Sequence, residues 1–339
     1  MYNFRDTNRY EEETRMKTVK VGLLGFGNVG TGTYQTLDMN KSHIKETSNV
    51  DIEITKVLVS DVTKKRSIET PDGLLTDNVE DIISNPEIDI VVEVLGGIEP
   101  ASSYMLKALE NGKHVVTANK AAVAANYQKL LDAAKANNVQ LKLEACVAGG
   151  IPILHPLTTV LMANQFDEIL GILNGTTNYI LTQMTEFGLD YADVLKVAQE
   201  KGFAEADPTA DVEGFDAANK LSILMALAFN KYVHPDEIPT EGISKITKED
   251  IDKATEKGCK IKLIASATKD GDDIKFSVKP MELPVSHPLA TVSNEFNAVF
   301  VKGNAVDELM FYGKGAGPLP TGSAVMGDVL IVAKDIANK

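Results

Sequence analysis

The chain contains 339 residues, of which 44% are hydrophobic and 24% are charged. This balance is typical of a globular protein, and the length suffices for about two domains. No stretch approaches the roughly 20 apolar residues of a membrane-spanning helix. The net charge of −14 and the lack of a Lys/Arg-rich block argue against nucleic acid or a membrane surface as a partner. Two cysteines, Cys146 and Cys259, are too few for a disulfide framework or a thiolate zinc site, so we expect a cytoplasmic protein.

The first half of the chain alternates strands with helices. Residues 1–15 are polar and charged, contain no signal-peptide core, and are expected to form an extension or a short extra helix. Expected strands then cover 19–24, 52–59, 89–94, 114–117 and 139–145, and expected helices cover 29–37, 79–84, 101–111 and 121–137. Strands separated by helices of this length predict βαβ units in a parallel sheet.

The pattern changes after about residue 148. Glycines and prolines interrupt it, and strands are then expected at 166–173, 261–268, 274–280 and 298–302, with helices at 178–185, 191–201 and 215–229. A Gly/Pro-rich turn at 313–320 precedes a last expected helix at 323–336. These elements predict a second sheet in a second domain of mixed composition.

A glycine-rich segment directly follows the first expected strand. Its sequence, Gly25-Phe26-Gly27-Asn28-Val29-Gly30, has the G-x-G-x-x-G spacing of a dinucleotide-binding turn. The first glycine permits the tight turn, the second lets a pyrophosphate approach the backbone, and the third lets helix pack on strand. The following helix presents free N–H groups to the phosphates. The surrounding βαβ pattern favours a nicotinamide dinucleotide site over a purely structural turn.

The end of the second expected strand leaves the choice of cofactor open. Asp61 is placed to hold the adenosine ribose hydroxyl of NAD, whereas Lys64, Lys65 and Arg66 follow at once. Three cations suit the 2′-phosphate of NADP, but they are equally consistent with a solvated surface.

The segment 202–220 contains five carboxylates and ends in a lysine. Asp216 and Lys220 are four residues apart on an expected helix and therefore share a face. The residues after Lys220 are apolar on nearly all sides, which predicts a buried helix and a partly desolvated lysine. Composition alone favours the simpler interpretation, an exposed ion pair at a helix start.

Several longer motifs instead favour a functional site over an exposed ion pair. They are HVVTANK (114–120), EACVAGGIP (144–152), ILNGTTNYIL (172–181), GFAEADPTADVEGFDAANK (202–220) and GKGAGPLPTGSAVMGD (313–328). Together with the glycine segment they resemble the homoserine dehydrogenases, in order from about residue 18 onward. The resemblance implies an α/β fold with a Rossmann domain, 16–147 completed by 313–339. It also implies an α+β catalytic and dimerisation domain, 148–312, with a mixed sheet, and at least a homodimer.

The resemblance also implies an activity and its residues. Members interconvert L-homoserine and L-aspartate 4-semialdehyde with NAD or NADP, toward threonine, methionine and isoleucine. Lys220 matches the lysine that exchanges a proton with the substrate oxygen, and Asp216 a carboxylate near it. Lys120 resembles a second active-site lysine, Glu205 a substrate-binding glutamate, and Asp211 another acid of the pocket.

The remaining implied residues form three groups. The substrate loop is Asn174, Gly175 and Thr176. Cofactor contacts are residues 25–30 with Gly96, Thr117, Lys120 and Gly315. Glu144, Val147, Gly149 and Ile151 match positions that bind a monovalent cation such as sodium, for which carbonyl and carboxylate oxygens are suitable ligands.

The chemistry itself sets a further expectation. Oxidising an alcohol requires a hydride acceptor, which the nicotinamide supplies, and a base for the hydroxyl proton. A lysine base requires a lowered pKa, and we expect desolvation or the neighbouring cation Lys120 to lower that of Lys220. A thioester-forming role for Cys146 is disfavoured because the sequence positions no histidine base beside it.

Two alternatives remain on sequence grounds. One is another NAD(P) oxidoreductase, a relative of sugar or inositol dehydrogenases, and the other is a nucleotide sensor without catalysis. The first gives no reason for the NGTTNY and EADPTAD motifs together. The second does not explain the clustered lysine and carboxylates, which are costly without a reaction to serve. Because the sequence ends at Lys339, about ten residues beyond GSAVMGD, we also expect no C-terminal ACT domain and no allosteric inhibition by threonine.

Overall fold

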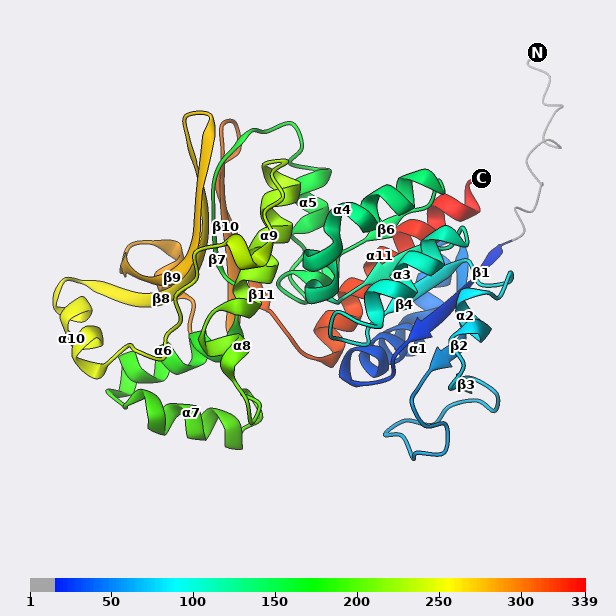
Figure 1. The fold of residues 1–339 in the computed structure, drawn as a ribbon, viewed down its shortest axis with the longest axis horizontal. Helices are drawn as coiled ribbons and strands as arrows, with labels where there is room; N and C mark the ends of the chain where they lie inside the picture. Colours follow the sequence, from blue (N-terminus) through cyan, green and yellow to red (C-terminus); the bar gives the residue numbers. More distant parts are fainter. Residues whose placement is uncertain (1–15) are drawn as a thin grey trace, which may run out of the picture.

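The computed structural model describes residues 16–339, so the expectation for 1–15 lies outside the described residues. Its N-terminal lobe contains a parallel sheet of β1 (Lys17–Leu24), β2 (Val50–Leu58), β3 (Leu75–Thr76), β4 (Ile90–Glu93), β5 (His114–Thr117) and β6 (Leu141–Lys142). The strand order is β3-β2-β1-β4-β5-β6, which confirms the predicted Rossmann topology. The order reverses at β1 and β4, and their carboxyl ends open toward the second lobe (Figure 1).

Helices cover both faces of this sheet. The helices are α1 (Asn28–Ser48), α2 (Glu80–Ile83), α3 (Ala101–Glu110), α4 (Lys120–Ala136) and α11 (Pro318–Ala337). One core cluster joins α1 and α11 to the strands through residues such as Leu37 and Val329, and another joins α2 to α4 through Met105 and Leu130. The chain therefore returns from the second lobe to pack α11 against the first.

Two helix boundaries differ from the sequence prediction. The first helix continues well beyond residue 37 and ends at Asn49, which has a left-handed conformation. The last helix begins at Pro318 rather than 323, because proline is well tolerated in the first turn, where its missing N–H has no helical partner. The expected strand at 139–145 is confined to β6 and is followed by a short 3₁₀ turn, η1 (Glu144–Cys146).

Two glycines let α1 and α11 approach closely. A Cβ on Gly322 would lie 2.5 Å from the carbonyl carbon of Gly32, whereas a Cβ on Gly327 in the same helix would meet nothing within 4 Å. We therefore expect Gly322→Ala to lower the free energy of unfolding by about 1–3 kcal/mol through overpacking. Gly327→Ala is the matched control and should be neutral or slightly stabilising. Thermal unfolding of both variants checks this, and equal midpoints would contradict the packing described.

The second lobe is built on an antiparallel sheet. Its strands are β7 (Phe166–Ile172), β8 (Cys259–Asp270), β9 (Asp273–Pro284), β10 (Phe296–Gly303) and β11 (Asp307–Lys314), in the order β11-β10-β7-β8-β9. All four pairings are antiparallel, so the expected mixed sheet is wrong. A parallel contact occurs as an isolated bridge between Thr240 and Val278. β11 was not predicted, because its exposed residues alternate with half-buried ones and lack a long apolar run.

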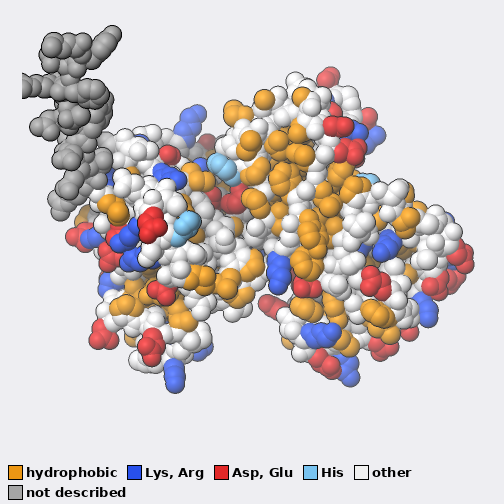
Figure 2. Space-filling view, turned by 180° about the vertical axis from the view of Figure 1, so that it is seen from behind, with side chains coloured by type: hydrophobic (Ala, Val, Ile, Leu, Met, Phe, Trp, Pro, Cys, Tyr) orange, Lys and Arg blue, Asp and Glu red, His pale blue; other side chains and the backbone are white. Residues whose placement is uncertain are grey.

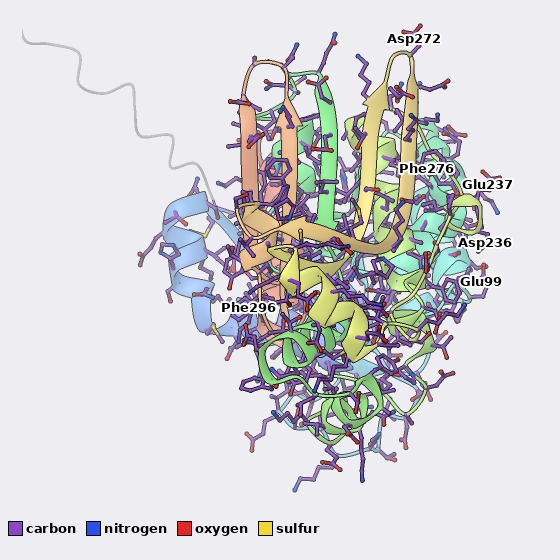
Figure 3. The ribbon with its side chains drawn as sticks, turned by 90° about the vertical axis from the view of Figure 1, so that its left-hand side faces the viewer. Glu99, Asp236, Glu237, Asp272, Phe276 and Phe296 are labelled. Atoms are coloured by element: carbon purple, nitrogen blue, oxygen red, sulfur yellow. The ribbon has the colours of Figure 1, made fainter. Side chains whose placement is uncertain are left out.

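Helices pack on one face of this sheet. They are α5 (Leu154–Thr158), α6 (Gly175–Phe187), α7 (Tyr191–Glu200), α8 (Thr209–Val212), α9 (Phe215–Ala228) and α10 (Lys248–Glu256). On the other face, η3 (Pro288–Thr291) covers a small cluster that includes Ile172 and Phe300. Figure 3 looks onto this second face, with the segment containing η3 crossing in front of the strands. No helix within residues 16–339 is long and apolar enough to cross a membrane.

Candidate active site

A cleft of about 620 Å³ lies between the two lobes. The space-filling view shows the molecule hollowed between them (Figure 2). The lining begins in the Rossmann lobe at Asn28, Val29, Ala118 and Lys120, and passes Cys146 and Gly149. It then includes Asn174, Gly175, Thr176, Glu205, Asp211, Asp216, Lys220, Asn297 and Gly315. The sequence-predicted cofactor turn, catalytic residues and substrate loop therefore share one cavity.

The glycine-rich turn has the geometry that its motif predicts. Gly25 has a φ of +108°, which favours glycine, and a Cβ on Gly30 would lie 2.2 Å from the carbonyl oxygen of Gly25. Gly27 precedes the first residue of α1, and a Cβ there would meet nothing within 4 Å. The start of α1 is thus open to an incoming phosphate. Phe26 is buried beneath the turn rather than exposed in the cleft.

The other predicted cofactor residues divide into two groups. Lys120 and Gly315 line the cleft, and Gly96 lies in open space with a φ of +84°. Thr117 does not line it: its hydroxyl is fully buried and donates to Glu93 at 2.7 Å. The amide of Asn119 donates to the same carboxylate at 3.3 Å, and its oxygen caps α4. Glu93 therefore anchors the turn that presents Lys120.

Asp216 lies between two lysines. Its carboxylate is 2.5 Å from Nζ of Lys220 and 3.3 Å from Nζ of Lys120. Lys220 also donates to the carbonyl of Leu173 at 2.6 Å. Asp216 and Lys220 occupy the first turns of α9, on the shared face that the sequence predicted, and both are buried. The interpretation of Asp216 and Lys220 as an exposed surface ion pair is thereby excluded.

Charge and burial compete at this site. Burial alone would raise the pKa of Asp216, but the charges of Lys220 and then Lys120 outweigh it and hold the pKa far below its usual value. In return, the Asp216 charge raises the pKa of Lys120. A carboxylate therefore separates the two lysines that were expected to act on each other directly. In this arrangement Lys120 is held as an ammonium group, ready to donate a proton.

The substrate loop is tied to the acidic segment. The Asn174 amide donates to Asp211 at 2.7 Å and to Asp216 at 3.0 Å, while its oxygen caps α6. Thr176 donates to Asp211 at 3.1 Å. Burial, and then the Asp216 charge, raise the pKa of Asp211. Glu205 lines the cleft as an exposed residue, so its carboxylate is accessible to a solute.

The residues matched to a cation loop lie beside this cleft. The Glu144 carboxylate accepts the backbone N–H groups of Ile153, Leu154 and His155. Within residues 16–339 no N–H donates to the carbonyl oxygens of Val147, Gly149 or Ile151. These three carbonyl oxygens are therefore free to accept. Among the described residues, no group of three or more His, Cys, Asp or Glu side chains could hold a metal ion.

Cys146 lines the cleft without the features of a nucleophile. It is 1% exposed, and its thiol donates to the carbonyl of Thr117 at 3.3 Å. Burial raises the pKa of this thiol well above its usual value, so the thiolate is disfavoured. The interpretation of Cys146 as a structural residue is thus supported.

The comparisons with known proteins cover nearly the whole chain. A family model described as homoserine dehydrogenase matches residues 152–330, and a model of the homoserine dehydrogenase NAD-binding domain matches residues 25–144. The homoserine dehydrogenase of Bacillus subtilis is 47% identical over 95% of this chain and 74% of its own length. The Corynebacterium glutamicum homoserine dehydrogenase is 48% identical over 94% of this chain and 72% of its own length. The chain belongs to the homoserine dehydrogenase family.

Solved homoserine dehydrogenases have the same fold. The Thiobacillus denitrificans structure superposes with a TM-score of 0.92 at 44% identity, covering 96% of this chain and 75% of that one. A hyperthermophilic archaeal homoserine dehydrogenase in complex with NADPH gives 0.79 at 26% identity, covering 93% and 97%. Membership makes the chain an NAD(P)-dependent oxidoreductase, and the cleft described above is where its parts converge.

Several residues of the cleft were not predicted from the sequence. Lys314, Thr321 and Asn297 complete the cleft wall, and Glu93 anchors it from below. Glu93 is the last residue of β4 and the last but one of the predicted strand 89–94. Polar residues at the carboxyl ends of parallel strands gather around ligands, so its position could have identified it. Asn297 lies in a strand without a charged or glycine-rich neighbour motif, and no local signal pointed to it.

Proposed function

We propose that Lys220, assisted by Asp216 and Lys120, moves the proton in the reaction by which homoserine dehydrogenases interconvert L-homoserine and L-aspartate 4-semialdehyde. The observation that supports this most strongly is the buried Lys220–Asp216 pair in the same cleft as the dinucleotide turn. When bound, the nicotinamide exchanges the hydride with the carbon. In the direction of aldehyde reduction, an ammonium group stabilises the developing alkoxide and then donates its proton.

Asp216 has a positioning role in this proposal. Both of its oxygen atoms are engaged by lysine ammonium groups, and the Asn174 amide donates to one of them. Held in this way, Nζ of Lys220 lies beside the substrate loop, Asn174 to Thr176, and donates to the carbonyl of the preceding residue, Leu173. In the direction of alcohol oxidation the same lysine must first lose a proton, so we expect oxidation to become faster toward alkaline pH.

The α-ammonium of the substrate suits the acidic wall of the cleft. Glu205 is accessible, and Asp211 is held by Asn174 and Thr176 with its carboxylate toward the same space. Charge-assisted hydrogen bonds contribute about 1.5–3 kcal/mol each. We therefore expect kcat/KM for L-homoserine to exceed that for 4-hydroxybutyrate, which lacks the ammonium, by about 100-fold. Equal values in a steady-state assay would refute this assignment of the acidic wall.

The choice of cofactor depends on the turn after β2. The Asp61 carboxylate accepts the N–H and hydroxyl of Thr63 at 2.8 and 2.7 Å, and these bonds hold its pKa below the usual value. Arg66 donates to the Asp61 carbonyl at 2.6 Å, while Lys64 and Lys65 are exposed. A cation here suits the 2′-phosphate of NADP.

We expect both cofactors to be used. Replacing Lys64, Lys65 and Arg66 together by glutamine should weaken NADP binding about tenfold or more beyond any effect on NAD. Isothermal titration with each cofactor measures this. Equal weakening would mean that the cations are a solvated surface.

A monovalent cation such as sodium fits the loop 147–151. The free carbonyl oxygens of Val147, Gly149 and Ile151 are the hard oxygen donors that such an ion prefers, whereas the Glu144 carboxylate already accepts three backbone N–H groups. The Gly150 amide donates to the carbonyl of Lys314, next to Gly315 in the cleft wall. A bound ion would therefore stabilise the wall of the active site rather than take part in the proton transfer.

We also propose a homodimer formed through the face of the second sheet that lies opposite its helices. β11 is an edge strand, and its residues Met310 and Tyr312 are large, hydrophobic or aromatic, and exposed. Hydrophobic side chains gather on this lobe in the space-filling view (Figure 2). We further propose a division into a Rossmann domain, 16–147 with 313–339, and a second domain, 148–312, and the packing of α11 on α1 and the Rossmann strands supports it.

A further inference from the structure

Asn297 has an unusual environment for a buried amide. It is the second residue of β10 and is 1% exposed. Neither its Nδ2 nor its Oδ1 has a hydrogen-bond partner within residues 16–339. Leaving a buried donor and acceptor unpaired is costly, so this amide requires a partner that the described chain does not supply, such as a ligand or a water.

The alternation of β10 directs this amide toward the cleft. Phe296, labelled in Figure 3 near the lower end of the sheet, stacks on Tyr312 with ring centroids 5.2 Å apart. Phe296 and Ala298 belong to the cluster on the outer face of the sheet. Because side chains alternate along a strand, Asn297 points to the opposite face and lines the cleft.

Two glycines flank the amide. A Cβ on Gly315 would lie 2.2 Å from both Cγ and Nδ2 of Asn297, and a Cβ on Gly175 would lie 3.7 Å from Oδ1. Gly175 is the first residue of α6, in the substrate loop, and Gly315 belongs to the turn between β11 and α11. Asn297 is therefore placed where the substrate loop and the cofactor wall meet, with backbone rather than side chains on either side.

The nicotinamide must also occupy this junction. Hydride transfer requires the ring to lie between the dinucleotide turn and the carbon next to Lys220, and the cleft connects the two past Ala118, Cys146 and Gly315. A primary carboxamide on the ring offers one donor group and one acceptor. Those are complementary to the unpaired acceptor and donor of Asn297.

We propose that Asn297 pairs with the carboxamide of the nicotinamide and so fixes the face that the ring turns toward the substrate. Oδ1 accepts from the carboxamide NH₂, and Nδ2 donates to its carbonyl oxygen. Because Gly315 lies directly against the amide, this pairing requires the 315–317 turn to move aside. Asn297 thereby contributes to cofactor specificity, and its effect is separate from proton transfer at Lys220.

A cofactor analogue tests this pairing directly. The 3-acetylpyridine dinucleotide keeps the carbonyl but replaces the NH₂ by a methyl group. Asn297→Leu keeps the shape of the side chain and removes both polar atoms. We expect it to lower kcat/KM for the natural cofactor about tenfold or more, with a smaller loss for the analogue. The ratio of the two losses cancels the intrinsic reactivity of the analogue.

Asn178 provides a matched control. It is equally buried in the same lobe, but its amide donates to the carbonyls of Val292 and Phe296 and accepts from Lys262. Asn178→Leu should lower the melting temperature and leave the preference between the two cofactors unchanged. Asn297→Leu should keep or raise the melting temperature of the cofactor-free protein, since an unpaired amide is removed.

Two results would overturn the proposal. One is an Asn297→Leu enzyme that discriminates between the natural cofactor and the analogue as strongly as the original. The other is a loss of thermal stability in Asn297→Leu as large as that in Asn178→Leu, which would show that the Asn297 amide is paired within the protein.

Discussion

Replacing Lys220 with alanine is expected to lower kcat by about three orders of magnitude, because general acid–base catalysis typically contributes between a hundredfold and ten-thousandfold. The cofactor Kd should change by less than about threefold, since Lys220 contacts Asp216 and the Leu173 carbonyl rather than the dinucleotide turn. Stopped-flow rates and fluorescence titration with reduced cofactor measure the two quantities. Lys220→Arg should lower kcat to a similar extent, because arginine does not release its proton.

Lys231 provides the matched control for this experiment. It follows α9, the helix that contains Lys220, and its ammonium lies 5.8 Å from the ring centroid of Phe276, away from the residues that line the cleft. Lys231→Ala should retain the original kcat. A Lys220→Ala protein that loses cofactor binding as strongly as turnover would show that the lysine is structural.

Replacing Asp216 with asparagine should have the next largest effect. We expect kcat to fall by about two orders of magnitude, since the carboxylate positions both ammonium groups. The pH dependence should also change. The Asp216 charge raises the pKa of Lys120, and the same carboxylate lies 2.5 Å from Nζ of Lys220, where it attracts the ammonium form. Without that attraction, the proton taken up in alcohol oxidation can leave the site at lower pH.

The measurement is the pH profile of kcat for homoserine oxidation. In Asp216→Asn its rising alkaline limb should move to lower pH, although the maximum rate is reduced. An unchanged limb, or a limb displaced to higher pH, would contradict the electrostatic coupling between Asp216 and the lysines.

The Rossmann lobe was predictable because its signals are local. Apolar runs of four to eight residues bounded by helices specify a parallel sheet, and the glycine turn identifies its ligand edge. The second lobe was less predictable. β11 lacks an apolar run, and an antiparallel sheet built from strands far apart in sequence depends on pairings that no local pattern encodes, such as β7 between β8 and β10.

In the active site, too, only the features with a local sequence signal were predictable. Asp216 and Lys220 are four residues apart, so helical periodicity alone placed them on one face. The salt bridge from Lys120 to Asp216 crosses between lobes, and only the fold shows that the carboxylate separates the lysines. Asn297 is surrounded by residues distant in sequence, Gly175 and Gly315, and its unpaired amide is a property of packing. Such features are invisible to motif and spacing.

The most direct test of this account is the initial rate of nicotinamide reduction with L-homoserine as the sole substrate. It is measured with NAD and with NADP from neutral to alkaline pH, on the original chain and on Lys220→Ala. We predict a homoserine-dependent rise in the absorbance of the reduced cofactor that increases with pH and disappears in Lys220→Ala. A folded chain that binds the cofactor but shows no turnover with either dinucleotide, or a Lys220→Ala variant that is as active as the original, would contradict it.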